Sequence, residues 1–243
     1  SLRYGLVILL MLSLVRLALL AYNNDMVGDT PYSTVAEGFL NGLRFDLRVV
    51  VYISIPLLLA ILSPWAMARR GVFRFWLTLT SSVVMFLGLM EMDFYREFHQ
   101  RLNSLVFQYL EEDLGTVSSM LWNGFPVARY LLAWALGTVA MTMLLHWIEH
   151  ITRPRQVCPA LAWYLRFGVF FLCLLLAVIA ARGTLKQGPP LRWGDAYTTD
   201  SIFANHLGLN GILTLVDAAA NSFSDHRDNA WKATLPQAEA LAT

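Results

Sequence analysis

Long apolar runs separated by short polar stretches dominate the hydrophobic pattern of this sequence. A hydrocarbon core about 30 Å thick is crossed by about 20 helical residues, because each residue of an α-helix rises about 1.5 Å. Runs of that length predict membrane-spanning helices. The five expected spans are Tyr4–Tyr22, Leu47–Ala68, Arg74–Phe94, Tyr130–Ile148 and Pro159–Ala181.

Two further segments, around residues 98–122 and 200–217, show a different pattern. Apolar residues such as Leu102, Leu105 and Tyr109 recur every three or four positions, with charged and polar residues between them. This spacing is typical of an amphipathic helix that lies in the membrane interface. The predicted fold is therefore an all-α integral membrane protein with five transmembrane helices and extracytoplasmic interfacial helices.

The composition supports this class. Hydrophobic residues make up 57% of the chain and charged residues only 14%, against about 25% charged residues in an ordinary soluble domain. The mean hydropathy is +0.52. The two cysteines, Cys158 and Cys173, provide neither a disulfide framework nor the spacing of zinc ligands. No nucleic-acid partner is expected for this chain.

The distribution of basic residues predicts the orientation of the spans. If the N-terminus is cytoplasmic, the inner loops 63–74 and 149–166 hold six Arg in 30 residues, whereas the outer segments hold ten Lys or Arg in 127 residues. Cytoplasmic loops carry an excess of Lys and Arg. We therefore expect a cytoplasmic N-terminus and an external C-terminus, which in a bacterium with two membranes means an inner-membrane protein with a periplasmic C-terminus.

Residues 1–220 are expected to form the transmembrane domain. Residues 221–243 are polar, small and mixed in charge, so they cannot bury a core of their own and predict an extracytoplasmic linker to a soluble domain beyond Thr243. The first span resembles a cleavable signal peptide in length, but Arg16 interrupts the uncharged run that such a peptide has. Because the sequence lacks an initiator Met, further residues are expected before Ser1.

Arg16 needs a partner, because a charge inside a span costs about 2.5–3.5 kcal/mol on insertion scales. Its side chain is expected to face the interior of the helix bundle. Glu91 and Asp93 lie near the outer end of a span that runs in the same direction, so they are the predicted partners in a structural ion pair. A substrate contact is the alternative role for these three residues.

The stretch "HWIEH" at residues 146–150 matches the H-x-x-E-H spacing of some zinc peptidases. It lies at the cytoplasmic end of the fourth span, where no other acid is available as a ligand. Histidine near a helix C-terminus is also an ordinary compensation of the helix dipole. Cys158 is a conceivable additional ligand, but we predict no metal site here.

Four motifs lie around the spans: "NGLRFDLR" (41–48), "EMDFYREFHQRLNSLVFQYL" (91–110), "RGTLKQGPPLRWGDAY" (182–197) and "NHLGLNGI" (205–212). These motifs resemble those of one known family, the lipoteichoic-acid-synthase-like proteins, and the resemblance covers residues 6–217. In that family five transmembrane helices precede an extracytoplasmic domain of the sulfatase and alkaline-phosphatase type.

The resemblance implies a metal-dependent transferase that moves phosphoglycerol or phosphoethanolamine from a phospholipid to an acceptor glycan or lipid of the bacterial cell envelope. Its threonine nucleophile and its divalent metal (manganese, magnesium or zinc) would belong to the soluble domain. Neither a catalytic residue nor a cofactor is therefore expected within residues 1–243, whose role would be to anchor the catalyst and present its lipid. The alternative is a non-catalytic lipid-sensing regulator of envelope synthesis. Additional partners would be a second copy of the chain or an envelope-synthesis protein.

A lipid donor implies phosphate contacts at the outer headgroup level. Guanidinium groups make bidentate bonds to phosphate oxygens, although Arg at a span end also commonly anchors the helix in the interface. Glu91 and Asp93 are expected to orient these arginines or to contact the ammonium of an ethanolamine headgroup. The candidate headgroup-binding residues are Arg44, Arg48, Arg96, His99, Arg101, Asn103 and Gln108.

Overall fold

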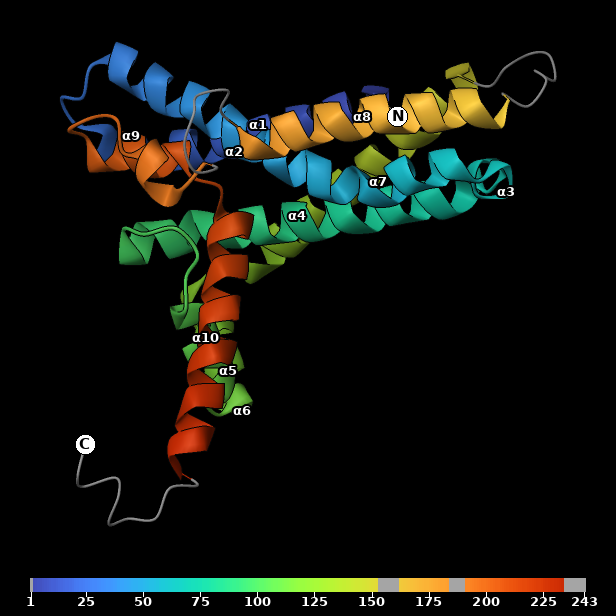
Figure 1. Ribbon diagram of the computed structural model, residues 1–243. Helices are drawn as coiled ribbons and strands as arrows, with labels where there is room; N and C mark the ends of the chain where they lie inside the picture. The colour runs from blue at the N-terminus through green and yellow to red at the C-terminus, as the bar shows by residue number, and fades with distance from the viewer. Residues whose placement is uncertain (1, 153–161, 184–190, 234–243) are drawn as a thin grey trace.

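The computed structural model describes residues 2–152, 162–183 and 191–233, and every regular element among them is a helix (Figure 1). Five helices in this part of the chain are long and apolar enough to cross a membrane. This confirms the all-α architecture with five potential spans and indicates a membrane protein. The five are α1 (Leu2–Tyr22), α2 (Tyr32–Leu59), α4 (Arg70–Phe98), α7 (Val127–Thr152) and α8 (Trp163–Arg182).

Helix α2 begins at Tyr32, well before the expected start of the second span at Leu47. The additional turns bury Val35, Gly38 and Gly42 on one face, and α9 (Ile202–Gly208) packs along α2. A Cβ atom at Gly38 would collide with the backbone of α9. Contact with α9 therefore accounts for helical structure in a stretch whose hydropathy alone did not predict it.

The second span also ends earlier than expected. The short helix η2 (Ala60–Leu62) follows α2, and Ser63 is extended before the five-residue helix α3 (Pro64–Ala68). A residue before proline disfavours the helical conformation. The Ser63 hydroxyl accepts a hydrogen bond from the Ala66 N–H at 3.4 Å and so caps α3.

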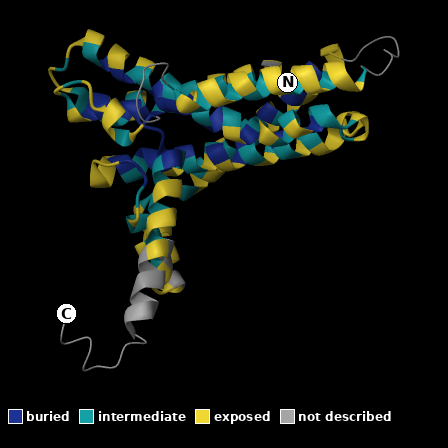
Figure 2. Ribbon diagram, in the orientation of Figure 1, coloured by how far each residue is buried: buried dark blue, intermediate teal, exposed yellow. Residues whose placement is uncertain are grey.

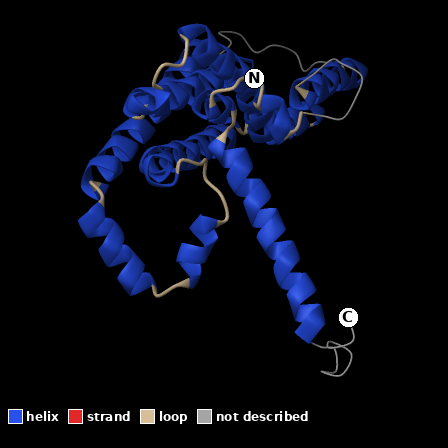
Figure 3. Cartoon of the chain, turned by 90° about the vertical axis from the view of Figure 1, so that its left-hand side faces the viewer, coloured by secondary structure: helices blue, strands red, loops and turns tan. Residues whose placement is uncertain are grey.

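The predicted amphipathic segment 98–122 forms two short helices, α5 (Leu105–Glu111) and α6 (Leu114–Gly124). Asp113 separates them, because its Oδ2 accepts the Thr116 N–H at 2.8 Å and starts α6. Hydrogen bonds from Thr116 hold the pKa of the Asp113 carboxyl below its usual value. In Figure 3 both short helices project from the bundle of long helices.

The predicted amphipathic segment 200–217 contains α9, whose position in the membrane interface stays a prediction. Phe203, Ala204 and Leu207 of this helix are buried, because its apolar side packs on α2 rather than facing outward. Helix α10 (Gly211–Ala233) then leaves the bundle crosswise to the long helices (Figure 1). The first part of the predicted linker, residues 221–233, is helical as part of α10, while residues 234–243 lie outside the described part.

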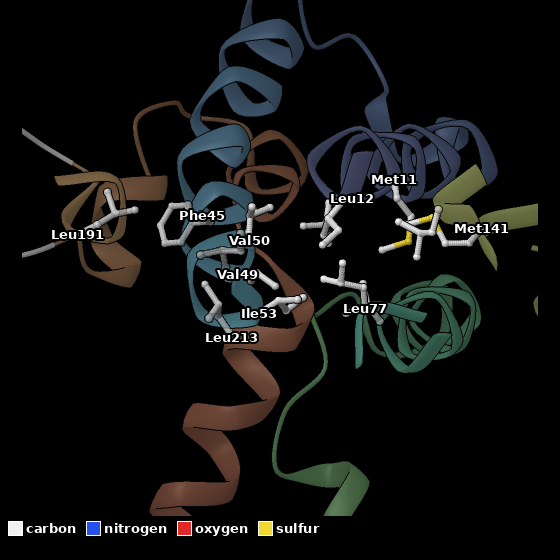
Figure 4. Close-up of a cluster of buried hydrophobic side chains, with 14 of the residues drawn as sticks. Met11, Leu12, Phe45, Val49, Val50, Ile53, Leu77, Met141, Leu191 and Leu213 are labelled. Atoms are coloured by element: carbon white, nitrogen blue, oxygen red, sulfur yellow. The ribbon is translucent and has the colours of Figure 1, made fainter. Parts of the chain in front are cut away.

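The main core lies where α1, α2, α4 and α7 meet the start of α10. Figure 4 shows side chains from these helices, including Leu12, Phe45, Leu77, Met141 and Leu213, in one buried cluster. The outward faces remain apolar and exposed (Figure 2), which is the surface that lipid would cover. Helix α8 is the extreme case, since none of its described residues is buried. The expected start of this span at Pro159 lies outside the described residues, as does Cys158.

Candidate functional site

The most deeply buried charges of the described chain are Arg16 on α1 and Asp46 on α2. Their side chains are 2% and 1% exposed, and Arg16 Nη2 lies 2.5 Å from Asp46 Oδ1. Isolated ions of this kind are costly to remove from water unless they are paired and hydrogen-bonded. The contacts around Arg16 therefore decide whether the pair is stable.

All five N–H donors of Arg16 have an acceptor. Nε donates to Asp46 Oδ2 at 3.3 Å, and Nη2 donates to Asp46 Oδ1 and to the Gly42 carbonyl at 3.0 Å. Nη1 donates to the carbonyls of Leu207 and Leu209, the latter at 2.8 Å. A guanidinium has five donors and no acceptor, so this side chain is fully satisfied. Two of its bonds hold the end of α9 and the residue that follows it, just before α10.

Asn210 links the same segment back to Asp46. Its Nδ2 donates to Asp46 Oδ1 at 2.7 Å, and its Oδ1 accepts the Ile212 N–H at 3.0 Å at the start of α10. Gly42 and Asp46 share a helix face because they are four residues apart. A Cβ atom at position 42 would overlap the Arg16 guanidinium, so glycine is what allows the close approach.

A second buried ion pair reaches the same backbone from the other side. Arg101 Nη1 lies 3.2 Å from Glu91 Oε2, with both side chains 6% exposed. Arg101 Nη2 donates to the Leu209 carbonyl at 2.7 Å, so Arg16 and Arg101 share one acceptor. Burial lowers the pKa of Arg101, and the Glu91 carboxylate opposes that shift. We call Arg16, Asp46, Glu91, Arg101 and Asn210 the buried polar cluster.

The buried polar cluster corrects the predicted ion pair. Arg16 pairs with Asp46, not with Glu91 or Asp93, because Asp46 faces α1 across Gly42. Glu91 is instead paired with Arg101. Asp93, two residues after Glu91 on α4, accepts a hydrogen bond from the Tyr22 hydroxyl at 2.6 Å. The expectation that Arg16 has an acidic partner within the bundle is confirmed, with a different partner.

Arg101 was also expected to contact a lipid headgroup, and that role stays a prediction. It lies 7% exposed inside the protein, where its charge is neutralised by Glu91. Arg44 and Arg48 are half-buried and hold the end of α8: Arg44 donates to the Gly183 carbonyl at 2.9 Å, and Arg48 donates to those of Ala181 and Leu191 at 2.8 and 2.9 Å. These bonds give both residues a structural role, and headgroup binding by them stays a prediction.

The remaining candidates lie in the last turn of α4 and in the segment that follows it. Arg96 is exposed and lies 3.4 Å from Asp25 Oδ2. His99 ends α4 in the left-handed conformation with φ of 54°, and Asn103 Oδ1 accepts the Leu105 N–H at 3.0 Å at the start of α5. Gln108 is exposed on α5 and lines an open groove. The structure thus brings the candidates to one end of the bundle but not into one site.

The "HWIEH" stretch lies at the opposite end of the spans. Glu149 Oε2 accepts a hydrogen bond from Arg74 Nη1 at 2.8 Å, and the same nitrogen lies 3.1 Å from His146 Nδ1. Arg74 and Glu149 therefore connect the start of α4 to the end of α7. Among the described residues no group of three potential ligands is placed to hold a metal ion.

Sequence analysis did not identify Asp46 as the partner of Arg16 and did not single out Asn210. A usable signal was present in α2, where Gly38, Gly42 and Asp46 recur every four residues. Small residues on one helix face indicate close approach of another segment, and an acid in line with them indicates a buried partner. The identity of that partner is not readable from the spacing.

Within the described residues, these features define an all-helical protein with five helices suited to span a membrane and a charged cluster that ties α10 to them. No protein-family model and no solved structure matches the chain. The similarity to the lipoteichoic-acid-synthase-like proteins stays a prediction from the motifs.

Proposed function

We propose that this chain is the membrane-anchoring and lipid-presenting part of a transferase that moves phosphoglycerol or phosphoethanolamine from a phospholipid to a cell-envelope acceptor. The observation that carries the proposal is the attachment of α10. The buried polar cluster holds residues 207–211, and α10 then runs away from the long helices (Figure 1). A helix held this firmly suits the connection to a catalytic domain that must stay at the membrane surface.

The two ends of α4 support a position for α10 at headgroup depth. Arg74 pairs with Glu149 near one end, and Glu91 pairs with Arg101 near the other. The 17 residues from Arg74 to Glu91 rise about 26 Å in an α-helix, close to the roughly 30 Å of a hydrocarbon core. Both ion pairs then lie at membrane boundaries, and α10 leaves the bundle at one of them.

The positive-inside distribution supports placing α10 on the outer side. The arginine-rich stretch with Arg69, Arg70 and Arg74 lies at the end opposite the buried polar cluster, as expected of the cytoplasmic end of the spans. On the outer side, a transferase breaks the bond between the headgroup phosphorus and the diacylglycerol oxygen. The phosphorus forms a new bond to an acceptor hydroxyl oxygen, and the acceptor proton ends on diacylglycerol.

Transfer is tested with the full-length protein in vesicles that contain phosphatidylethanolamine and phosphatidylglycerol, with labelled acyl chains. We expect protein-dependent release of diacylglycerol together with a headgroup-modified acceptor. A folded full-length protein that binds these lipids but releases no diacylglycerol would overturn the proposal and favour the lipid-sensing regulator.

A pair of variants in the same assay tests whether the buried polar cluster positions the catalyst. Asp46→Asn removes the charge that neutralises Arg16, so we expect transfer from membrane lipid to fall about tenfold or more while hydrolysis of a small soluble phosphodiester persists, since breaking a buried pair costs about 3–5 kcal/mol. Glu149→Gln is the matched control, because it makes the same chemical change at the far end of the spans. Equal losses in both variants, or on both substrates, would contradict the positioning role.

A further inference from the structure

A small cavity lies inside the buried polar cluster, where α1, α2 and α4 meet the start of α10. All five residues of the cluster line it, and its volume is about 20 Å³. One water molecule needs roughly 10–15 Å³, whereas a small-molecule site spans about 300 Å³ or more. The size of the cavity therefore restricts its ligand to a molecule of about the size of water.

Arg101 lines this cavity with a donor that the protein leaves unpaired. Its side chain is 6% exposed, and its Nε has no hydrogen-bond acceptor among the described residues. Its Nη1 lies 3.2 Å from Glu91 Oε2 without the geometry of a hydrogen bond, while Nη2 donates to the Leu209 carbonyl. A buried donor without an acceptor is costly. Arg101 therefore needs an acceptor at Nε in addition to these contacts.

Two carboxylates that line the cavity have capacity for a further donor. A carboxylate offers about four lone-pair sites. Glu91 Oε1 accepts the Leu102 N–H at 3.4 Å, and Asp46 Oδ2 accepts from Arg16 Nε at 3.3 Å. Both distances are long for a bond to a carboxylate, so neither oxygen is saturated. The cavity thus combines an unpaired donor with under-used acceptors, and a molecule that both accepts and donates satisfies the two together.

The charges around the cavity disfavour an ion. Arg16 and Arg101 are balanced by Asp46 and Glu91, and no other described residue that lines the cavity is charged. An anion would meet two carboxylates and a cation would meet two guanidinium groups, so neither would gain enough to offset its loss of hydration. A neutral water molecule does not pay this cost, and polar buried cavities commonly hold one.

We infer that this cavity binds one long-lived water molecule, which accepts from Arg101 Nε and donates to Glu91 and Asp46. A buried water typically makes about three hydrogen bonds, and this arrangement provides that number. The water joins the ion pair of Glu91 on α4 to the ion pair between α1 and α2. The inference is independent of the proposed function, because it depends only on the interior of the helix bundle.

The test is proton-detected solid-state NMR of the purified chain in lipid bilayers, with isotope-labelled arginine. We expect a cross-peak from water to the Arg101 Nε–H that is the same at two pH values, because dipolar transfer from a bound water does not depend on pH. The Arg101→Lys variant assigns the signal. A missing cross-peak would overturn the inference, and so would one that grows with pH, since it would report proton exchange with bulk water.

Val84→Ile tests whether the water lies in this cavity. Val84 is 6% exposed on α4 and lines the cavity, so the additional methylene group takes up the space that the water needs. Val83→Ile is the matched control, because it makes the same change at the next residue, which is 50% exposed and does not line the cavity. We expect the cross-peak to disappear in the first variant and to remain in the second.

A cross-peak that persists in a folded Val84→Ile protein would place the water elsewhere and overturn the inference. Thermal unfolding of both variants separates loss of the water from loss of the fold. If Val84→Ile does not fold, Val15→Ile fills the same cavity from α1, and the same loss of the cross-peak is expected.

Discussion

Arg16 illustrates how a single residue inside an apolar helix constrains the rest of the chain. Its five donors require acceptors, and the structure supplies them from α2 and from the backbone at the end of α9. Two of those acceptors are carbonyls left free by the end of a helix, which commonly lack intrahelical partners. The charge is therefore stabilised by segments far away in sequence.

Gly42 and Gly211 make room for the side chains of the buried polar cluster. Gly211 provides a prediction at the scale of a single residue. A Cβ atom at Gly211 would overlap the Glu91 carboxylate, whereas one at Gly168 on α8 would meet nothing within 4 Å. Glu91 is buried and paired with Arg101, so it cannot move aside freely. We expect Gly211→Ala to destabilise the protein by about 1–3 kcal/mol, as overpacking does.

Thermal unfolding in detergent measures the effect, with Gly168→Ala as the control. Alanine stabilises an exposed position within a helix more than glycine does. The Gly168→Ala control should therefore unfold at the same temperature as the unaltered protein or at a slightly higher one. A Gly211→Ala protein as stable as the control would show that Glu91 has more freedom than its ion pair indicates.

At the scale of an element, α8 shows how a helix without buried residues is held in place. Its end is left-handed at Gly183, with φ of 68°, and Arg44 and Arg48 donate to carbonyls in and after its last turn. Charged donors near a helix C-terminus also interact favourably with the helix dipole. These bonds join α8 to α2, against which it packs.

Replacing Arg48 should therefore loosen the last turn of α8 more than any other helix. A hydrogen bond to a charged group contributes about 1.5–3 kcal/mol, so we expect Arg48→Met to speed amide hydrogen exchange at residues 179–183 by about tenfold or more. Arg129→Met removes an exposed arginine at the start of α7 and is the control. Unchanged exchange at the end of α8 would contradict the capping role.

Helix α9 shows why a periodic pattern does not identify its partner. The same apolar spacing suits a membrane interface or another helix, and only the structure shows that the apolar side of α9 packs against Gly38 of α2. His206 on this helix contacts the Tyr95 hydroxyl at 3.1 Å, and burial, assisted by the nearby Arg101, lowers its pKa. The interface position of α5 and α6 stays a prediction.

At the scale of the whole molecule, the exposed apolar faces of the five long helices indicate a membrane protein. The predicted orientation has a direct test. Cys158 and Cys173 are first replaced, and a single cysteine is then introduced as Ser119→Cys on α6 or Ala68→Cys on α3. The two positions lie at opposite ends of the bundle. A membrane-impermeant maleimide should therefore label only the Ser119→Cys protein in intact cells. Labelling of Ala68→Cys alone would show that the orientation is the opposite of the predicted one. The catalytic domain and the lipid donor would then not share a compartment, as the proposed transferase requires.

The sequence by itself determined the helical class and the existence of five long apolar helices, because hydropathy over about 20 residues is a local property. It also indicated that Arg16 needs an acidic partner, since the energetic cost of a lone charge does not depend on the fold. Only the tertiary structure decided that the partner is Asp46, that Asn210 joins them and that α9 is buried. Asp46 and Asn210 are 164 residues apart, and contacts at that separation depend on how α9 packs on α2, which no single segment encodes.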